Sequence, residues 1–289
     1  MQLKVAYKDI LHLRYNKYLN KENKLDEKLM NLFNRLFRKP TEKSQLPILL
    51  GMVLLPNETL FSLESVINDH QQHYSVRIVP EGDDIASSFT IDGEEIGIIS
   101  IDKPVPADDI QRTAQYTYNW KTALEDLKDH HAHIIIAITN GSFNMIKRFK
   151  LQTQLLCSVL RTTNAIGVYI GEQSLLIPKD KYLRDAENMS DTILPINLWV
   201  YFGLRVVDGL SNAYTYGLKA FAKDEIEVLD SNEDLYNLLE MLINITQYVL
   251  LNDVTFKPGQ TLGYTAQQQI MISYSEGSYV EGNSFKLLF

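Results

Sequence analysis

The 289-residue sequence contains a single cysteine, Cys157, so an internal disulfide is impossible, and this cysteine usage fits a reducing compartment. A long apolar run is also missing. The longest one, residues 46–55, is closed by Pro56 and has about half the length of a membrane span. Residues 1–20 lack the compact apolar stretch and the cleavage site of a signal peptide. We therefore expect a cytoplasmic protein without a membrane-spanning helix.

Motifs that specify a reaction are absent from the sequence as well. It has no G-x-G-x-x-G or G-x-x-x-x-G-K-[ST] loop for phosphate groups. It also has no G-x-S-x-G turn for a nucleophilic serine. Cys157 falls on the apolar stripe of a helix predicted for residues 144–161, where a buried thiol is unreactive. We expect no cofactor, and no particular reaction follows from these patterns.

Charge is distributed unevenly along the chain. Residues 1–45 contain eleven Lys/Arg and five Asp/Glu, a balance of +6, whereas the other 244 residues contain 17 and 31, a balance of −14. A basic arm on an acidic body can mark a contact with nucleic acid or a membrane. The alternative is an arm that packs on its own acidic body.

Within the arm, apolar side chains recur at helical spacing and predict a basic amphipathic helix that Pro40 ends. The stripe consists of Leu25, Leu29, Leu32, Phe33, Leu36 and Phe37. A helix of this kind can lie on an anionic membrane. A stripe of this kind can equally belong to a core or an interface.

The remaining chain mixes short strands with helices. Asp92-Gly93 and Asp208-Gly209 predict tight turns between strands, because both residues tolerate positive φ angles. Strands are predicted at residues 48–55, 74–79, 88–91, 96–101, 134–138, 166–170, 196–207, 213–222 and 225–229, followed by three short strands at the C-terminus. Helices are predicted at residues 58–70, 108–130 (two stretches), 144–161, 178–189 and about 231–251.

Hairpins outnumber βαβ repeats in this pattern, which predicts an α+β fold with mixed, mostly antiparallel sheets. We predict a basic helical N-terminal arm (residues 1–45) and two closely packed α+β halves, residues 46–164 and 165–289.

Three histidines, His130, His131 and His133, lie between a predicted helix and an apolar strand. His131 and His133, two residues apart on a strand, would share a face and could bind a metal ion. The alternative is that histidines in a last helical turn complement the helix dipole. Since no further ligand is recognisable, we expect no metal site.

Paired carboxylates occur at Glu225 and Glu227, in a strand-like segment. They are expected to share one face, where they could do acid–base work or hold a cation. The alternative is the exposed face of a half-buried strand. Tyrosines gather in the same part of the chain, and exposed tyrosines are enriched in binding surfaces. They are Tyr201, Tyr214, Tyr216, Tyr264, Tyr274 and Tyr279.

The segment AYTYGLKAFAKDEIEVL at residues 213–229 resembles a bacterial family known only as a domain of unknown function, DUF4261. Residues 53–56, 120–138 and 258–263 fit the same resemblance, which would cover residues 48–289. The family brings no catalytic residues to carry over. Its resemblance implies an immunity protein, which would bind and mask a toxin without chemistry, and an acidic body suits a basic partner.

The leading hypothesis is therefore a non-enzymatic binding protein, an immunity or accessory protein of a bacterial toxin system. Its candidate binding residues are Tyr214, Tyr216, Lys223, Glu225 and Glu227. The alternative is a hydrolase or metal-dependent enzyme that uses the glutamates or the histidines. A contact with nucleic acid or a membrane through the basic arm is a third possibility.

The change of net charge from +6 in residues 1–45 to −14 in the rest of the chain, together with Pro40, predicts that the arm is separable from the body. Deleting residues 1–44 should leave a protein that unfolds cooperatively on heating, because the predicted core begins at Ile48. Calorimetry of the truncated chain tests this. An insoluble product, or a soluble one without a thermal transition, would show that the arm is part of the core.

Overall fold

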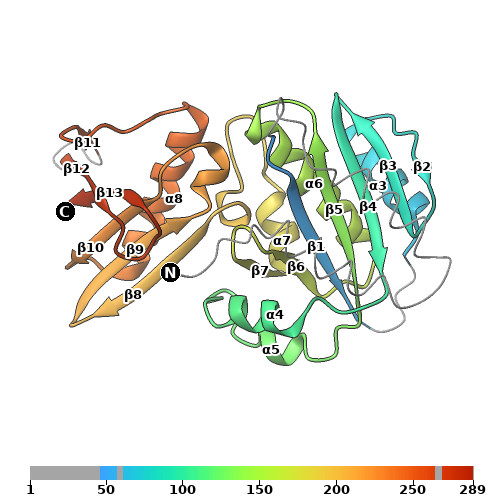
Figure 1. Cartoon of the computed structure of the whole chain (residues 1–289), viewed down its shortest axis with the longest axis horizontal. Coiled ribbons are helices and arrows are strands. Elements are labelled where there is room, and N and C mark those ends of the chain that lie inside the picture. Colours follow the sequence, from blue (N-terminus) through green and yellow to red (C-terminus); the bar gives the residue numbers. More distant parts are fainter. Residues whose placement is uncertain (1–45, 57–60, 264–268, 289) are drawn as a thin grey trace. The chain divides into compact units, whose positions relative to one another are not determined.

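The computed structural model describes residues 46–56, 61–263 and 269–288, so the basic arm lies outside the described residues. The chain divides into two compact units (Figure 1). Unit 1 runs to Glu172 and includes Leu176–Leu183, and unit 2 comprises Gln173–Leu175 and Arg184–Phe289. Each unit contains a mostly antiparallel sheet with packed helices, so the predicted α+β class is confirmed.

Unit 1 is built on a seven-stranded sheet in the order β2-β3-β4-β5-β1-β6-β7. The central strand β1 is buried along its whole length and pairs antiparallel with both β5 and β6, as its continuous apolar sequence requires. The strands are β1 (Leu49–Leu55), β2 (Glu81–Gly82), β3 (Ala86–Ile91), β4 (Glu94–Ile101), β5 (Ala132–Asn140), β6 (Gly167–Ile170) and β7 (Leu175–Pro178).

Strand β6 shows how the structure differs from the sequence-based division at residues 164 and 165. Residues of β6 pair with Met52–Leu54 of β1, so this strand belongs to the sheet of unit 1. A pairing between strands more than 100 residues apart leaves no local pattern, and the sequence therefore assigned β6 to the following half.

The helices of unit 1 are α3 (Leu63–Tyr74), α4 (Ala107–Ala114), α5 (Ala123–Asp126) and α6 (Met145–Thr162), together with most of α7 (Lys179–Ala186). Helix α6 begins where the sequence predicts, since Asn144 caps it by accepting from the Lys147 amide at 3.0 Å. The strand predicted at residues 74–79 is wrong. Helix α3 continues to Tyr74, and the following segment is irregular, with the Ile78 amide donating to Gln71 Oε1 at 2.7 Å.

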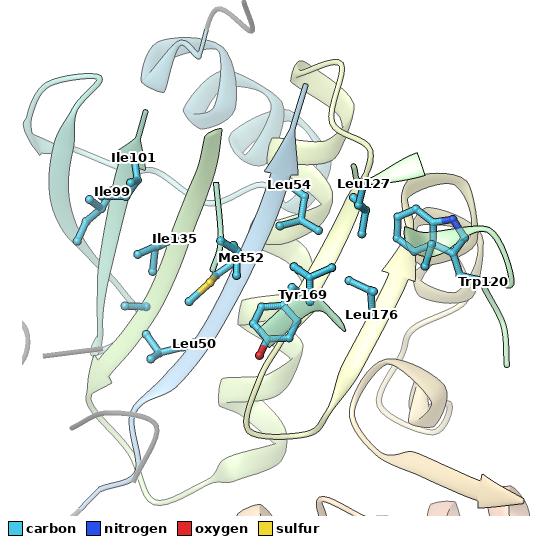
Figure 2. Packing of buried hydrophobic residues seen from close by; sticks show 14 of the residues in the cluster. Leu50, Met52, Leu54, Ile99, Ile101, Trp120, Leu127, Ile135, Tyr169 and Leu176 are labelled. Atoms are coloured by element: carbon cyan, nitrogen blue, oxygen red, sulfur yellow. The ribbon is translucent and has the colours of Figure 1, made fainter. Parts of the chain in front are cut away.

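The core of unit 1 occupies both faces of the sheet. Gly51 of β1 faces Leu156 of α6, so Leu50, Met52 and Leu54 point to the opposite face. There they join an apolar cluster that includes Trp120 and Leu127 (Figure 2).

Unit 2 contains a six-stranded sheet in the order β11-β12-β13-β10-β9-β8. Its strands are β8 (Tyr201–Val207), β9 (Leu210–Tyr216), β10 (Ile226–Ser231), β11 (Thr261–Gly263), β12 (Gln269–Glu276) and β13 (Asn283–Leu288). The pairing of β10 with β13 is parallel, and the pairings β8–β9, β9–β10, β11–β12 and β12–β13 are antiparallel. Helix α8 (Leu235–Leu251) packs against β8 and β9.

The two faces of this sheet differ in chemistry. Cross-strand partners share a face, and the pairs Val228–Ala213, Ile226–Phe285 and Ile272–Leu287 form an apolar side. The opposite side carries polar residues and contains the site described below.

Two predicted strands of unit 2 are shorter than expected. The predicted strand 196–207 begins as a 3-10 helix, Ile196–Leu198, and only Tyr201–Val207 is extended. The predicted strand 213–222 ends at Tyr216 and is followed by a second 3-10 helix, Leu218–Phe221. In contrast, both Asp-Gly hairpins are confirmed, with φ of 50° at Asp208 and 82° at Gly209 in the second one.

The burial of Cys157 on α6 yields a prediction. The thiol is 2% exposed, and burial raises its pKa to about 12, so the nucleophilic thiolate is scarce at neutral pH. The folded protein should react with dithiobis-nitrobenzoate far more slowly than the protein unfolded in guanidinium, which should release one equivalent of the chromophore. Equal rates in the two states would contradict this burial.

Candidate functional site

The residues singled out from the sequence lie on the polar face of the unit 2 sheet. Tyr214 of β9, Glu227 of β10 and Lys286 of β13 are direct cross-strand partners, so their side chains form one row across three strands. The connection between β12 and β13 reaches this row, because its Ser278 and Tyr279 amides donate to Glu227. We refer to Tyr214, Glu227, Lys286 and Tyr279 as the polar row.

Glu227 is completely buried and is the acceptor at the centre of the polar row. The Tyr279 amide donates to it at 2.6 Å, the Ser284 hydroxyl at 2.6 Å and the Ser278 amide at 3.1 Å. The Lys286 ammonium lies 2.8 Å from Oε2. Burial alone would raise the pKa of Glu227, but Lys286 and the other donors outweigh burial and hold the pKa below its ordinary value.

Lys286 is 6% exposed, and its ammonium group is fully engaged. Besides the Glu227 carboxylate, it donates to the Glu276 carbonyl at 2.9 Å and to the Ser284 hydroxyl. An ammonium group has three protons to donate, so these three partners satisfy it. The pair is therefore a closed, charge-balanced unit inside the protein.

Glu225 is also buried, with 1% exposure, but it binds a different segment. Its Oε2 accepts from the Thr215 hydroxyl at 2.7 Å, and its Oε1 accepts from the Gly217 amide at 2.9 Å. The Lys219 amide adds a longer contact of 3.4 Å. Burial raises the pKa of Glu225 despite these donors. The expectation that both glutamates lie on an exposed strand face is thus wrong, because each is enclosed by partners from other segments.

The family-like segment at residues 214–218 has a structural role in this arrangement. The Thr215 hydroxyl donates to Glu225 and accepts from the Ile226 amide at 2.8 Å. Gly217 has φ of 124°, and a Cβ there would lie 3.2 Å from the Trp199 carbonyl oxygen, so glycine fits best. Leu218 is completely buried. These residues form a closed turn whose amides Glu225 satisfies.

The two candidate tyrosines differ in accessibility. Tyr214 is 7% exposed, and its ring stacks on Tyr279 with centroids 5.3 Å apart. It also fills the space above Gly203, where a Cβ would fall 2.0 Å from the ring. The Arg205 guanidinium lies 5.4 Å from the Tyr279 ring centre. Tyr216, by contrast, is 42% exposed.

Lys223 precedes Glu225 by two residues in the sequence and is held by an ion pair. Its ammonium donates to Asp253 Oδ1 at 2.6 Å and to the Thr255 hydroxyl at 3.3 Å. Of the five candidate binding residues, the structure therefore brings Tyr214 and Glu227 into one row, encloses Glu225 next to it, pairs Lys223 with Asp253 and exposes Tyr216.

The three histidines do not converge. His133 is buried in β5 with Nδ1 2.7 Å from the Lys103 carbonyl, and burial lowers its pKa to about 4. His131 is exposed and precedes β5. His130 lies 2.7 Å from the Leu127 carbonyl. Helix α5 ends at Asp126, so the expected place of the histidines in a last helical turn is wrong.

Residues 46–56, 61–263 and 269–288 contain no group of three or more His, Cys, Asp or Glu side chains placed to hold a metal ion. Within the same ranges, no helix is both long enough and apolar enough to cross a membrane.

Sequence reasoning missed Lys286, Ser284 and the 278–279 amides. A usable signal was present in the last strand, where Ser284 and Lys286 alternate with Phe285 and Leu287. A charged residue on the second face of a strand whose neighbours are buried requires a partner of opposite charge. In the structure this partner is Glu227.

Comparison with known proteins gives one family match, and it covers the part of the chain that contains the polar row. The model of a family described as a domain of unknown function (DUF4261) matches residues 214–288. The resemblance predicted from the sequence is thereby confirmed for this segment, which contains the polar row and Glu225. No curated protein matches the chain significantly, and no solved structure does.

The enclosed ion pair predicts a large stability cost for Glu227→Gln. The substitution leaves Lys286 buried without its counter-charge, which should lower the free energy of unfolding by about 3–5 kcal/mol. Urea denaturation at neutral pH measures the loss. The exposed control Glu233→Gln should change stability by no more than about 0.5 kcal/mol.

The difference in unfolding free energy between wild type and Glu227→Gln should depend on pH. Because the folded-state pKa of Glu227 lies below its ordinary value of 4.5, the group stabilises the protein above that pH and loses this effect as pH falls through the folded-state pKa. The stability gap between wild type and Glu227→Gln should therefore narrow in acid. A gap that is absent at pH 7, or that widens in acid, would contradict the geometry described above.

Proposed function

We propose that this chain is a non-enzymatic, cytoplasmic binding protein of the immunity or accessory type, which binds a basic protein partner such as a toxin. The observation that carries the proposal is the acidic surface of unit 2. In the described part of this unit, eleven exposed Asp and Glu residues stand against four exposed Lys and Arg residues. A surface of one sign attracts partners of the opposite sign and raises their association rate.

Part of this acidity gathers at one end of the sheet. Ser211 pairs with Ser231, which brings the β8–β9 turn and the β10–α8 connection to the same end. Asp208 lies in that turn, Asp230 lies near the end of β10, and Glu233 and Asp234 belong to the connection. All four are exposed. We refer to these four residues as the acidic end and propose that it contacts the partner.

The hydrogen bonds and the ion pair that occupy the two buried glutamates favour a binding role over acid–base chemistry. A general base must have a carboxylate oxygen within reach of a substrate proton. Both oxygens of Glu225 accept hydrogen bonds from the chain, and those of Glu227 accept from the chain and pair with Lys286. Their roles are therefore explained by folding, and the alternative of an enzyme that uses them loses its main support.

The same charge argument weighs against unit 2 as a nucleic-acid surface, because phosphate groups require a basic counterpart. A contact through the basic arm concerns residues outside the described ranges. It would leave the binding role proposed for the acidic end unaffected.

Neutralising the acidic end tests the proposal. Asp230→Asn/Glu233→Gln removes two charges, and asparagine tolerates the φ of 51° at position 230. Glu187→Gln/Glu276→Gln is the matched control, since it removes two exposed charges outside the acidic end. Each immobilised protein is exposed to lysate of its native host over a salt series, and retained proteins are identified by mass spectrometry.

We expect wild type and control to retain the same basic protein, and the acidic-end variant to retain several-fold less. The difference should be largest at low salt, where screening is weakest. Equal recovery by all three proteins would remove the acidic end from consideration. Failure of wild type to retain any basic protein would contradict the proposed function. A hydrolytic activity that Glu225→Gln abolishes in a folded protein would favour the enzyme alternative.

A further inference from the structure

The start of helix α6 carries the most exposed large apolar side chain in the described part of the chain. Phe143 is 79% exposed, and it immediately precedes Asn144, which caps α6. An apolar residue at this position often packs against the fourth residue of the helix. Here the fourth residue is Arg148, so the helix offers Phe143 no apolar partner at that position.

Arg148 is completely buried and binds the point at which the described chain begins. Its Nη1 donates to the Pro47 carbonyl at 2.7 Å, and its Nη2 donates to the Ile138 carbonyl at 2.8 Å. Its Nε lies 3.3 Å from the buried carboxylate of Glu94. Leu46, the first described residue, is 8% exposed. The chain that precedes residue 46 therefore joins the body at the first turn of α6.

Two further apolar residues of α6 extend the surface around this junction. Met145 and Ile146 are half-exposed, and Met145 Sδ lies 3.9 Å from the same Arg148 Nη1 that binds Pro47. We refer to Phe143, Met145 and Ile146 as the junction patch. Apolar residues that gather on a surface, unlike single ones, are typical of a place where another segment binds.

Acidic groups lie next to the junction patch. The β3–β4 turn is beside α6, because Lys147 Nζ donates to the Asp92 carbonyl at 2.8 Å. Asp92 and Glu95 of this hairpin are exposed, whereas Lys147 is half-exposed and lies 3.9 Å from the buried Glu94 carboxylate. Two exposed carboxylates therefore stand beside one partly covered ammonium group, which favours a basic segment.

We propose that the apolar stripe of the basic arm, residues 25–37, docks on the junction patch of the same chain. The stripe ends nine residues before Leu46, and nine residues span at most about 30 Å, so the patch is within its reach. Six Leu and Phe side chains of the stripe gain from burial. Arg35, Arg38 and Lys39 lie at the end of the arm nearest the body, where they can meet the two carboxylates. Docking of this kind leaves the arm separable, since it covers a surface and not the core.

Limited trypsin digestion of the full chain tests the docking. Cleavage after Lys28 and Arg35, within the stripe, must wait until the arm leaves the patch. We expect it to be several-fold faster in Phe143→Ser than in wild type. Leu124→Ser is the matched control and should leave the rate unchanged. Leu124 is also exposed, but α5 packs on the opposite face of the unit 1 sheet from α6.

A substitution in the arm gives an independent readout. Leu32 belongs to the stripe and does not adjoin a cleavage site, so Leu32→Ser should raise the rate about as much as Phe143→Ser. Because the two side chains would act through one contact, the double variant should be cleaved little faster than either single variant.

Equal cleavage rates in Phe143→Ser and Leu124→Ser would overturn the proposal, and so would effects of Leu32→Ser and Phe143→Ser that multiply in the double variant. Protection that increases with protein concentration would assign the arm to the patch of a second copy and reject docking within one chain. The docking is independent of the acidic end of unit 2, and neither outcome decides the role proposed for that end.

Discussion

The enclosed contact between Glu227 and Lys286 is the constraint on which the polar face of unit 2 depends. Two charged side chains project from neighbouring strands into a part of the protein from which water is almost excluded. Burying either charge alone would be very costly, so β10 and β13 must pair in the observed register. The β12–β13 connection follows, because its amides and the Ser284 hydroxyl satisfy the remaining acceptor positions of Glu227.

Other features of the segment follow from this contact. With the connection held over the sheet, Tyr279 stacks on Tyr214, and Tyr214 needs a glycine beneath it at position 203. Glu225 closes the adjacent turn through Thr215 and Gly217. Thr215 and Gly217, in the segment that resembles the family, thus help to hold this part of the fold together. The exposed residues in the described part of unit 2 carry a net negative charge.

The sequence predicted features that depend on neighbouring residues. The Asp-Gly turns, the helix that starts at about residue 144, the apolar strand β1 and the α+β class are local or periodic signals and are confirmed. Burial of the glutamates was missed because their state depends on distant residues, with Ser284 lying 57 positions from Glu227. Alternation within a strand marks its two faces without revealing what covers each. The prediction of a strand at residues 74–79 was wrong for a similar reason. Ile78 is buried, but it does not belong to a sheet.

The central claim, that Glu227 is a charged structural group and not a reactive one, is tested most directly by its titration in the folded protein. Carbon-13 NMR of the labelled glutamate carboxyl groups, assigned with Glu227→Gln, follows this group while pH is lowered. The account predicts that Glu227 titrates below its ordinary value of 4.5 and that the Tyr279 amide resonance shifts in the same step. A carboxyl group that titrates above that value, without any response from Tyr279, would contradict the account.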